Sequence, residues 1–288
     1  MSNSEAPFNS IAIVGLGLIG GSIALGVREC WPSSRVIGVD TEAVVAHALG
    51  SGAIDRAVDS VAALPETSLV ILAAPVRQNI DLLEQLARRN TRAVVTDVGG
   101  TKRDIVKAAR TLPASTIFVG GHPLGGGERG GFAFARPDLF AGRPWIFTPE
   151  GDASADAVER LSRLVAGLGA RPSIVAADEH DRLMAFLSHL PQLAASALMD
   201  AAGSATQAEG LRMAGRGLVD TTRLASSPAD VWRDICLTNA DAIGDALDCL
   251  IQRLTLLRND LERGDAIETI FTAAAKWRAE LLSQNKTS

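Results

Sequence analysis

The sequence predicts an α/β fold followed by an all-helical domain, on three observations. Short β-rich runs alternate with helical patterns over the first part of the chain, as in parallel sheets built from strand–helix–strand units. A glycine motif follows the first run directly and opens the first helical pattern. Beyond Ala177 no comparable strand recurs, and the apolar spacing becomes helical. We therefore expect a Rossmann-type doubly wound, mostly parallel sheet in residues 1–176 and a helical domain in residues 177–288.

Several of the β-rich runs are continuously apolar, which is typical of strands covered by helices on both faces. In chain order the runs are IAIVGLG, RVIGVD, LVILAAP, AVVTDVGG, TIFVGGHP, PWIFTP and PSIVAAD. Ligands of such sheets bind beyond the carboxyl ends of the strands. The residues that end the runs are therefore the candidate site, and they are Gly15–Gly20, Asp40, Ala74–Pro75, Asp97–Lys102 and His122–Pro123.

The second part of the chain has apolar residues at helical spacing in three segments, Leu183–Met199, Val231–Leu257 and Ile267–Leu282. Helices of this length carry apolar faces that packing within one chain leaves over, and such faces often pair with another copy of the chain. We therefore expect a homodimer that forms through the helical domain.

Composition narrows the class of function. With 288 residues, of which 47% are hydrophobic and 21% charged, the chain has ample core, which excludes a disordered or fibrous protein. A net charge of −5 offers no basic surface for a nucleic acid or an anionic membrane. The three cysteines form no paired pattern, which argues against disulfides and structural zinc and favours the cytoplasm.

The glycine motif after the first strand is G-x-G-x-x-G, formed by Gly15, Leu16, Gly17, Leu18, Ile19 and Gly20. The first glycine allows a tight turn, the second lets a pyrophosphate approach the backbone, and the third lets the helix pack on the strand. The positive end of that helix then faces the phosphates. We expect these residues to bind a dinucleotide, together with Ala74 and Pro75 at the end of the third run.

Asp40 indicates which dinucleotide binds. It ends the second run about twenty residues after the glycines, where a carboxylate accepts hydrogen bonds from a ribose 2′-hydroxyl. Its charge would repel a 2′-phosphate, and no Arg or Lys follows it directly. The sequence therefore favours NAD over NADP.

His122 is the candidate acid–base residue. It lies at a strand end in a glycine-rich run, and an imidazole there can move protons near neutral pH. His180 and His189 are nine positions apart, about half a turn out of phase on a helix, so we do not expect them to share a ligand. No H-x-x-x-H, H-E-x-x-H or Cys/His cluster predicts a metal, and no G-x-S-x-G elbow predicts a hydrolase.

Five motifs together resemble one known family. They are GLGLIGGS after the first strand, D-x-G-x-x-K at Asp97–Lys102, GGHPLGG at Gly120–Gly126, SHLP at Ser188–Pro191, and D-x-x-R with W-R-D-I within Asp220–Ile235. In this order they resemble the TyrA family of prephenate and arogenate dehydrogenases, from about Ile11 to Leu282. The resemblance implies NAD-dependent oxidative decarboxylation of prephenate to 4-hydroxyphenylpyruvate, a step of tyrosine biosynthesis.

The resemblance also implies roles for individual residues. His122 matches the catalytic histidine that takes the proton of the ring hydroxyl, and Arg223 matches the arginine that binds a substrate carboxylate. A guanidinium suits that role because it bonds two oxygens at once, and a dianionic substrate in an acidic protein needs a local cation. The other substrate-binding residues expected from the resemblance are Trp232, His189 and Glu128.

The chain departs from the family pattern at two positions. Gly100 stands where many members have a serine that orients the histidine, so Thr101, one residue displaced, is the candidate to replace it. Gln192 stands where many members have a histidine after SHLP, and it is expected to bind substrate through its amide. These changes leave open whether prephenate, arogenate or an amino analogue is the preferred substrate.

Two other functions compete with this interpretation. The β-hydroxyacid dehydrogenases use a lysine early in the helical domain, but this chain has no lysine between Lys107 and Lys276. A nicotinamide-sensing protein without turnover also fits the Rossmann half and the lost serine, and it stays open.

Overall fold

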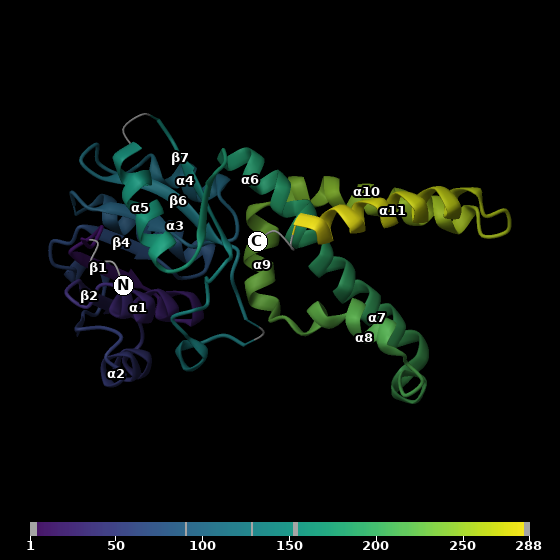
Figure 1. Cartoon of the computed structure of the whole chain (residues 1–288), viewed down its shortest axis with the longest axis horizontal. Coiled ribbons are helices and arrows are strands. Elements are labelled where there is room, and N and C mark those ends of the chain that lie inside the picture. The colour runs from purple at the N-terminus through teal and green to yellow at the C-terminus, as the bar shows by residue number, and fades with distance from the viewer. Residues whose placement is uncertain (1–4, 90, 128, 152–154, 285–288) are drawn as a thin grey trace.

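The computed structural model describes residues 5–89, 91–127, 129–151 and 155–284. A sheet with helices on both faces forms the first part of the molecule, and helices that extend away from it form the second (Figure 1). The predicted fold class is confirmed.

The sheet contains eight strands in the order β3-β2-β1-β4-β5-β6-β7-β8, and all neighbours are parallel except the antiparallel pair β6 and β7. All seven predicted runs are strands. The eighth, β3, contains two residues, too few to form a pattern in the sequence. The strands are β1 (Ser10–Val14), β2 (Arg35–Val39), β3 (Arg56–Ala57), β4 (Leu69–Leu72), β5 (Val94–Asp97), β6 (Ile117–Pro123), β7 (Pro144–Pro149) and β8 (Arg171–Ile174).

Two apolar clusters cover the two faces of the sheet, whose central strands β1, β4 and β5 are buried on both sides. Helices α1 and α5 pack on one face through side chains such as Ile23 and Leu161, and α3 and α4 pack on the other through Leu83 and Ile105. The helices of this part are α1 (Leu18–Cys30), α2 (Glu42–Gly50), α3 (Val76–Ala87), α4 (Arg103–Ala109) and α5 (Ala155–Gly167), with short 3₁₀ turns η1 (Val61–Ala63) and η2 (Phe132–Phe134).

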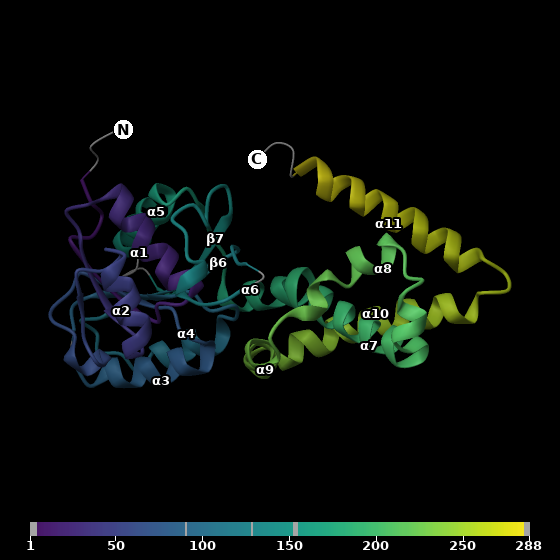
Figure 2. The same cartoon turned by 90° about the horizontal axis from the view of Figure 1, so that it is seen from below.

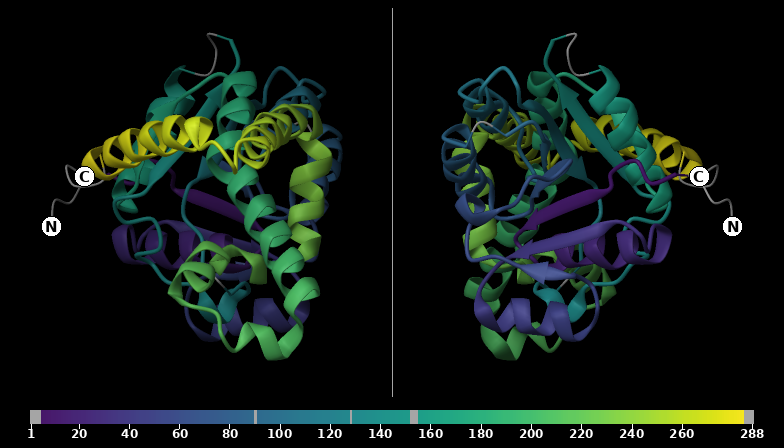
Figure 3. Two further views of the ribbon diagram at one scale, coloured as in Figure 1. Left: turned by 90° about the vertical axis from the view of Figure 1, so that its right-hand side faces the viewer. Right: turned by 90° about the vertical axis from the view of Figure 1, so that its left-hand side faces the viewer.

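The helical part diverges into two arms, one of α10 and α11 and one of α7 and α8 (Figure 1). Helix α11 separates from α10 beyond the turn that joins them (Figure 2) and extends to one side of the molecule (Figure 3). The elements are α6 (Ala177–Met184), the π-turn η4 (Ala185–His189), α7 (Leu190–Leu211), α8 (Arg216–Thr221), the 3₁₀ turn η5 (Arg223–Ser226), α9 (Ala229–Thr238), α10 (Ala240–Asn259) and α11 (Asp265–Gln284).

Two of the three predicted helical segments are interrupted. The run Leu183–Met199 crosses from α6 through the π-turn η4 into α7, and π-turns within helices occur frequently at functional sites. The run Val231–Leu257 is broken at Asn239, whose φ of −144° ends α9 before α10 begins. Both interruptions lie next to the sheet domain, where Asn239 and His189 are buried.

The helical part buries few apolar side chains of its own. Its cluster of buried residues consists of Ala185, Ile243 and Ala246, whereas Phe271 and Trp277 of α11 are 65% and 68% exposed. Across the described residues, no helix combines the length and hydropathy that a membrane span requires.

Candidate active site

The glycine turn after β1 has the geometry that its sequence predicts. Gly15 has a φ of +94°, and a Cβ there would lie 2.7 Å from the carbonyl carbon of Ala73. A Cβ on Gly20 would lie 1.9 Å from the carbonyl oxygen of Gly15, so only glycine allows α1 to pack this closely. A Cβ on Gly17, in contrast, would meet no atom within 4 Å. Gly17 therefore faces open space in which a ligand can approach the backbone.

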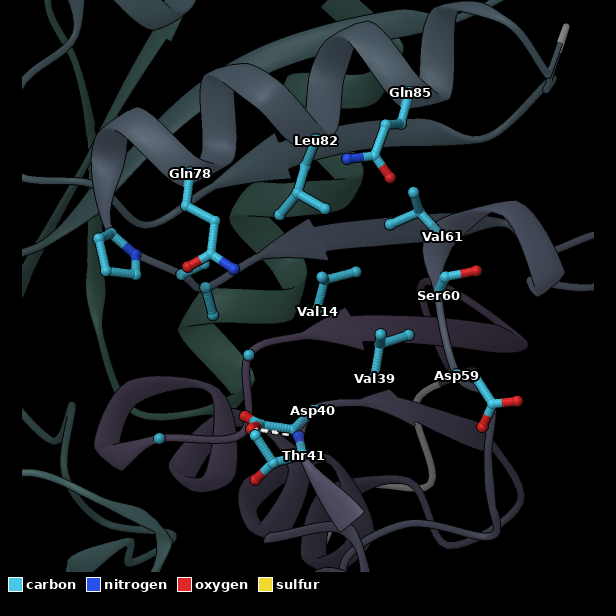
Figure 4. A pocket seen from close by; sticks show the side chains of 15 residues that line it. Val14, Val39, Asp40, Thr41, Asp59, Ser60, Val61, Gln78, Leu82 and Gln85 are labelled. Atoms are coloured by element: carbon cyan, nitrogen blue, oxygen red, sulfur yellow. Dashed lines mark hydrogen bonds between the residues drawn. The ribbon is translucent and has the colours of Figure 1, made fainter.

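A pocket of about 540 Å³ opens beside this turn, at the carboxyl ends of β1, β2 and β4. Five predicted cofactor residues line it, and they are Gly15, Gly17, Asp40, Ala74 and Pro75. Figure 4 shows Asp40 and Thr41 on one side of the pocket and Gln78, Leu82 and Gln85 of α3 on the other.

Asp40 braces the glycine turn. One carboxylate oxygen accepts the backbone N–H of Leu16 at 2.6 Å and the other accepts that of Thr41 at 2.7 Å. Leu18 and Ile19 form the first turn of α1, where backbone N–H groups have no partner within the helix. The site fits a dinucleotide with a free 2′-hydroxyl. The open backbone at Gly17 and the free amides at the helix start suit the pyrophosphate, and the Asp40 carboxylate at the strand end suits the ribose.

His122 lies near the carboxyl end of β6, at the same edge of the sheet as this pocket. Its Nδ1 atom is 2.8 Å from Nε2 of His180, and Nδ1 of His180 is 2.8 Å from Oδ1 of Asp181. His180 and Asp181 belong to α6, so the helical part supplies the partners of a histidine on the sheet. The three side chains form a continuous hydrogen-bonded row.

This row fixes which nitrogen of His122 is basic. A carboxylate only accepts hydrogen bonds, so His180 donates through Nδ1–H to Asp181. With His180 neutral, its Nε2 is then an acceptor, and His122 must donate through Nδ1–H. The Nε2 atom of His122 is left with a free lone pair, and Gly100 lies beside it, since a Cβ on Gly100 would be 3.9 Å away.

The electrostatics around the row keep His122 neutral and Asp181 charged. Burial lowers the pKa of His122 well below its ordinary value, and the nearby His180, Lys102 and His189 lower it further. Burial alone would raise the pKa of Asp181, but hydrogen bonds from His180 and from the amides of Arg103 and Lys102 lower it. Those two amides lie 2.9 and 2.7 Å from the Asp181 carboxylate.

Lys102 and Asp97 form a fully buried ion pair under the same edge of the sheet. Asp97 also accepts the N–H groups of Gly99 at 2.7 Å and Gly121 at 3.1 Å. It therefore ties the loop after β5 to the strand that carries His122. Burial lowers the pKa of Lys102 despite the attraction of Asp97.

A second set of contacts joins the two parts of the chain around the row. Arg103 at the start of α4 forms an ion pair with Asp241 and donates to the side-chain oxygen of Asn239 at 2.7 Å. Asn239 in turn donates to the carbonyl oxygen of Asp181 at 2.8 Å and lies 3.3 Å from Nδ1 of His189. The break between α9 and α10 thus places Asn239 where it holds α6 and η4 in place.

The loop between β5 and α4 connects the pocket to His122. A Cβ on Gly99 would lie 2.9 Å from Val76, the residue after Pro75 of the pocket wall. Gly100, the next residue, lies beside Nε2 of His122 and Ile235 of α9. Gly99 and Gly100 therefore lie between Val76, next to the pocket wall, and the free nitrogen of His122.

Comparison with known proteins gives the family. The model of the prephenate dehydrogenase nucleotide-binding domain matches residues 23–174, and that of the prephenate dehydrogenase dimerization domain matches residues 176–272. A prephenate dehydrogenase of Bacillus subtilis (strain 168) is 39% identical over 270 residues, which cover 91% of this chain and 72% of the relative. The chain belongs to the prephenate dehydrogenase family.

Other relatives within and around this family differ in the substrate that their names give. A cyclohexadienyl dehydrogenase of Zymomonas mobilis is 31% identical over 284 residues, 95% of this chain and 96% of the relative. A crystal structure of prephenate dehydrogenase from A. aeolicus with hydroxyphenyl propionate and NAD+ has a TM-score of 0.87 and 28% identity, covering 98% of this chain and all of that one. Synechocystis arogenate dehydrogenase has a TM-score of 0.75 and 26% identity, covering 94% and 99%.

The predicted substrate residues of this prephenate dehydrogenase family member lie in different surroundings. His189 is buried next to Asn239, with its ring edge-on to that of Trp232 at 6.1 Å between centroids, and burial lowers its pKa to about 4. Arg223 begins η5, is exposed, and makes no ion pair with any described residue. Glu128 lies outside the described residues.

Thr101 and Gln192 both bond to other parts of the protein. The hydroxyl of Thr101 lies 2.7 Å from that of Thr238 on α9, and its contacts give no support to a role in orienting His122. Gln192 is buried and bonded to η5. Among the described residues, no group of three or more His, Cys, Asp or Glu side chains is placed to hold a metal ion.

Three residues around His122 are absent from the sequence-based prediction of the site, and they are His180, Asp181 and Asn239. His180 and His189 are not expected from their spacing to share a ligand, yet both contribute to the network around His122. The available signal was the adjacent His-Asp pair where the sheet domain gives way to helices, since a carboxylate that bonds to one ring nitrogen of a histidine sets the state of the other nitrogen.

Proposed function

We propose that this protein catalyses the oxidative decarboxylation of prephenate to 4-hydroxyphenylpyruvate with NAD, as in tyrosine biosynthesis. The observation that carries the proposal is the row His122–His180–Asp181, whose free nitrogen faces the loop that leads from the dinucleotide pocket. Family membership and the relatives' names support the reaction class. When bound, NAD supplies the acceptor for the hydride that leaves the ring carbinol carbon.

His122 takes the proton of the ring hydroxyl at Nε2 as the carbinol is oxidised. The lowered pKa of His122 keeps this nitrogen unprotonated before the reaction. When the proton arrives, the imidazolium donates through Nδ1 to His180, which the ionised Asp181 orients. The bond to the ring carboxylate then breaks, carbon dioxide leaves, and the electron pair of that bond completes the aromatic ring. The oxygen takes the proton back from His122 to give the phenol, and formation of the aromatic ring makes the overall step favourable.

Arg223 binds a carboxylate of the dianionic substrate. The proposal is supported by the exposure of Arg223 and by the absence of an ion pair within the described part of the chain, which leaves both guanidinium edges available. The half-buried Trp232, whose ring lies edge-on to that of His189, is assigned to substrate binding by its match to the family. Glu128 remains a candidate on sequence alone.

Gly15, Gly17, Leu18, Ile19 and Gly20 hold the pyrophosphate through their backbone in this proposal, and Asp40 holds the adenosine ribose. We assign this role to residues 1–176 and place substrate binding and dimer formation in residues 177–288. The match to a dimerization domain and the exposed apolar side chains of α11 support a homodimer. We place the protein in the cytoplasm because its three cysteines form no paired pattern.

Arogenate is the second candidate substrate. Gln192 replaces the histidine that many family members carry, and relatives with the names cyclohexadienyl and arogenate dehydrogenase cover nearly the whole chain. Arogenate carries an amino group where prephenate carries a keto group, so the side-chain end of the site decides between them.

One rate series tests these possibilities. Prephenate and arogenate are each offered with NAD and with NADP, and absorbance of the reduced nicotinamide is followed. We expect the highest kcat/KM with prephenate and NAD. A higher value with arogenate would transfer the proposal to that substrate, and no turnover with any pair while NAD still binds would favour the sensing function.

A further inference from the structure

The side-chain nitrogen and the side-chain oxygen of Gln192 both bond to residues shortly after Arg223. Its Nε2 atom donates to the carbonyl oxygen of Leu224 at 2.7 Å, and its Oε1 atom accepts the hydroxyl of Ser227 at 3.1 Å. A longer contact of 3.4 Å joins Nε2 to the hydroxyl of Ser196, one turn along α7. Gln192 is only 4% exposed.

These bonds leave the amide little capacity for a substrate. A glutamine side chain offers two N–H donors and one oxygen acceptor, and the protein engages both ends of it. A ligand that bonded to Gln192 would have to displace a buried hydrogen bond to Leu224 or Ser227, which is unfavourable. The expectation that Gln192 binds substrate directly therefore has no support from its contacts.

Gln192 adds side-chain bonds to a turn that already packs against α7 and is closed by a backbone bond from the N–H of Ala225 to the carbonyl oxygen of Thr222 at 2.9 Å. The 3₁₀ turn η5 contains four residues, Arg223–Ser226, and such short turns have poor internal hydrogen-bond geometry. Leu224 accepts Gln192 and the N–H of Ser227 at 3.1 Å, so the same carbonyl fixes the end of the turn and ties it to α7. The first residue of this turn is Arg223, whose side chain extends into solvent.

We propose that Gln192 is a positioning residue that clamps the Arg223 turn onto α7 and so presents the Arg223 guanidinium to the substrate carboxylate. This inference rests on the proposed role of Arg223. The replacement of the family's histidine by Gln192 is then a change of role. The Gln192 amide positions Arg223, which binds the substrate, and does not itself contact the substrate.

Kinetics of three variants test the clamp. Gln192→Met keeps the size of the side chain and removes all three hydrogen bonds, Ser227→Ala removes one of them, and Ser227→Thr keeps the hydroxyl. We expect Gln192→Met to raise KM for prephenate about tenfold and Ser227→Ala about threefold, with Ser227→Thr close to wild type. The values of kcat and of KM for NAD should change by less than about twofold.

A double-mutant cycle with Arg223→Ala distinguishes the clamp from direct contact. If Gln192 acts through Arg223, Gln192→Met has no further effect on KM in the Arg223→Ala background. An undiminished effect there, with Ser227→Ala silent in the wild-type background, would show that Gln192 contacts the substrate and would overturn the inference. If Arg223→Ala itself leaves KM for prephenate unchanged, Arg223 does not bind the substrate. The inference that Gln192 positions Arg223 for the substrate is then wrong as well.

Amide hydrogen exchange of residues 222–227 supplies a readout that does not depend on activity. Gln192→Met should accelerate exchange in this segment by at least about tenfold and leave the strands of the sheet unchanged. Unchanged exchange in residues 222–227 would contradict the clamp even if KM rose. A general acceleration across the chain would contradict it as well, because it would show loss of overall stability.

Discussion

His122 and His180 are joined by a hydrogen bond of 2.8 Å between Nδ1 and Nε2, although one lies near the end of a strand of the sheet and the other in the first helix of the helical part. The base of the proposed reaction is therefore oriented across the junction of the two parts. Asp181 stabilises the junction twice, because it also accepts the first amides of α4. The contacts of His180 and Asp181 therefore hold the helical part against the sheet domain and also orient His122.

Replacing His180 by Phe tests this orientation. His180→Phe keeps a ring in the buried site but cannot accept the Nδ1–H of His122, so both tautomers of His122 become accessible. We expect kcat with prephenate and NAD to fall on the order of 10²-fold while the Kd of NAD stays within about twofold. A kcat within a factor of about two of wild type, in a variant that melts at a similar temperature, would rule out the orienting role.

Acid should destabilise the folded protein through His189. Burial holds its folded pKa at about 4, below the ordinary value of about 6.5, so the unfolded chain binds a proton between these values and the folded chain does not. Stability that is fully present above pH 6.5 is therefore lost as the pH falls toward 4, by on the order of 3 kcal/mol.

Thermal melting at pH 7 and pH 5 measures this effect. The lowered pKa of His122 contributes in the same direction, so the control is the difference between wild type and His189→Gln, which lacks the titrating ring. The loss of Tm between the two pH values should be smaller in His189→Gln. An equal or larger loss would mean that His189 is not protonated on unfolding in this range.

Asp40 should determine the choice between NAD and NADP. Asp40→Ala removes the charge that a 2′-phosphate would meet and also the brace on the Leu16 amide, so KM for NAD rises and the preference over NADP falls by at least about tenfold. The matched control is Glu42→Ala, which removes the same charge from outside the pocket and should keep the preference. A wild-type protein that prefers NADP would already refute the assignment.

Gly100 should accept the serine that many family members carry. A Cβ at this position would lie 3.6 Å from Ile235 and 3.9 Å from Nε2 of His122, which are ordinary contacts. We expect Gly100→Ser to fold normally, with kcat/KM for prephenate equal to or above that of wild type. Gly120→Ser is the contrasting variant, since its Cβ would lie 2.3 Å from the hydroxyl of Thr148, and it should lower Tm by several degrees. A folded but inactive Gly100→Ser would show that the open space is needed by the substrate.

The sheet and the dinucleotide turn could be predicted from sequence because their signals are local. Seven of the strands are short apolar runs, Gly15 and Gly20 each answer a steric demand of the turn, and Gly17 leaves the backbone open to a ligand. His122 was also predictable, since it ends a strand at the edge where ligands of such sheets bind.

The partners of His122 could not be predicted in this way. His180 lies 58 residues away along the chain, and only the docking of α6 on the sheet domain brings the two rings together. The sequence predicts one long helix through Asn239, because the apolar spacing continues on both sides of it. In the structure α9 ends and α10 begins there, and this break positions the Asn239 side chain. The role of Gln192 depends likewise on η5, whose Leu224 lies 32 residues further along the chain.

The most direct test of the central claim is the turnover of His122→Asn with prephenate and NAD, measured beside the Kd of NAD. If Nε2 of His122 takes the hydroxyl proton, kcat falls by about 10²–10⁴-fold while the Kd of NAD is unchanged. A variant that binds NAD normally and turns over prephenate at the wild-type rate would contradict the claim.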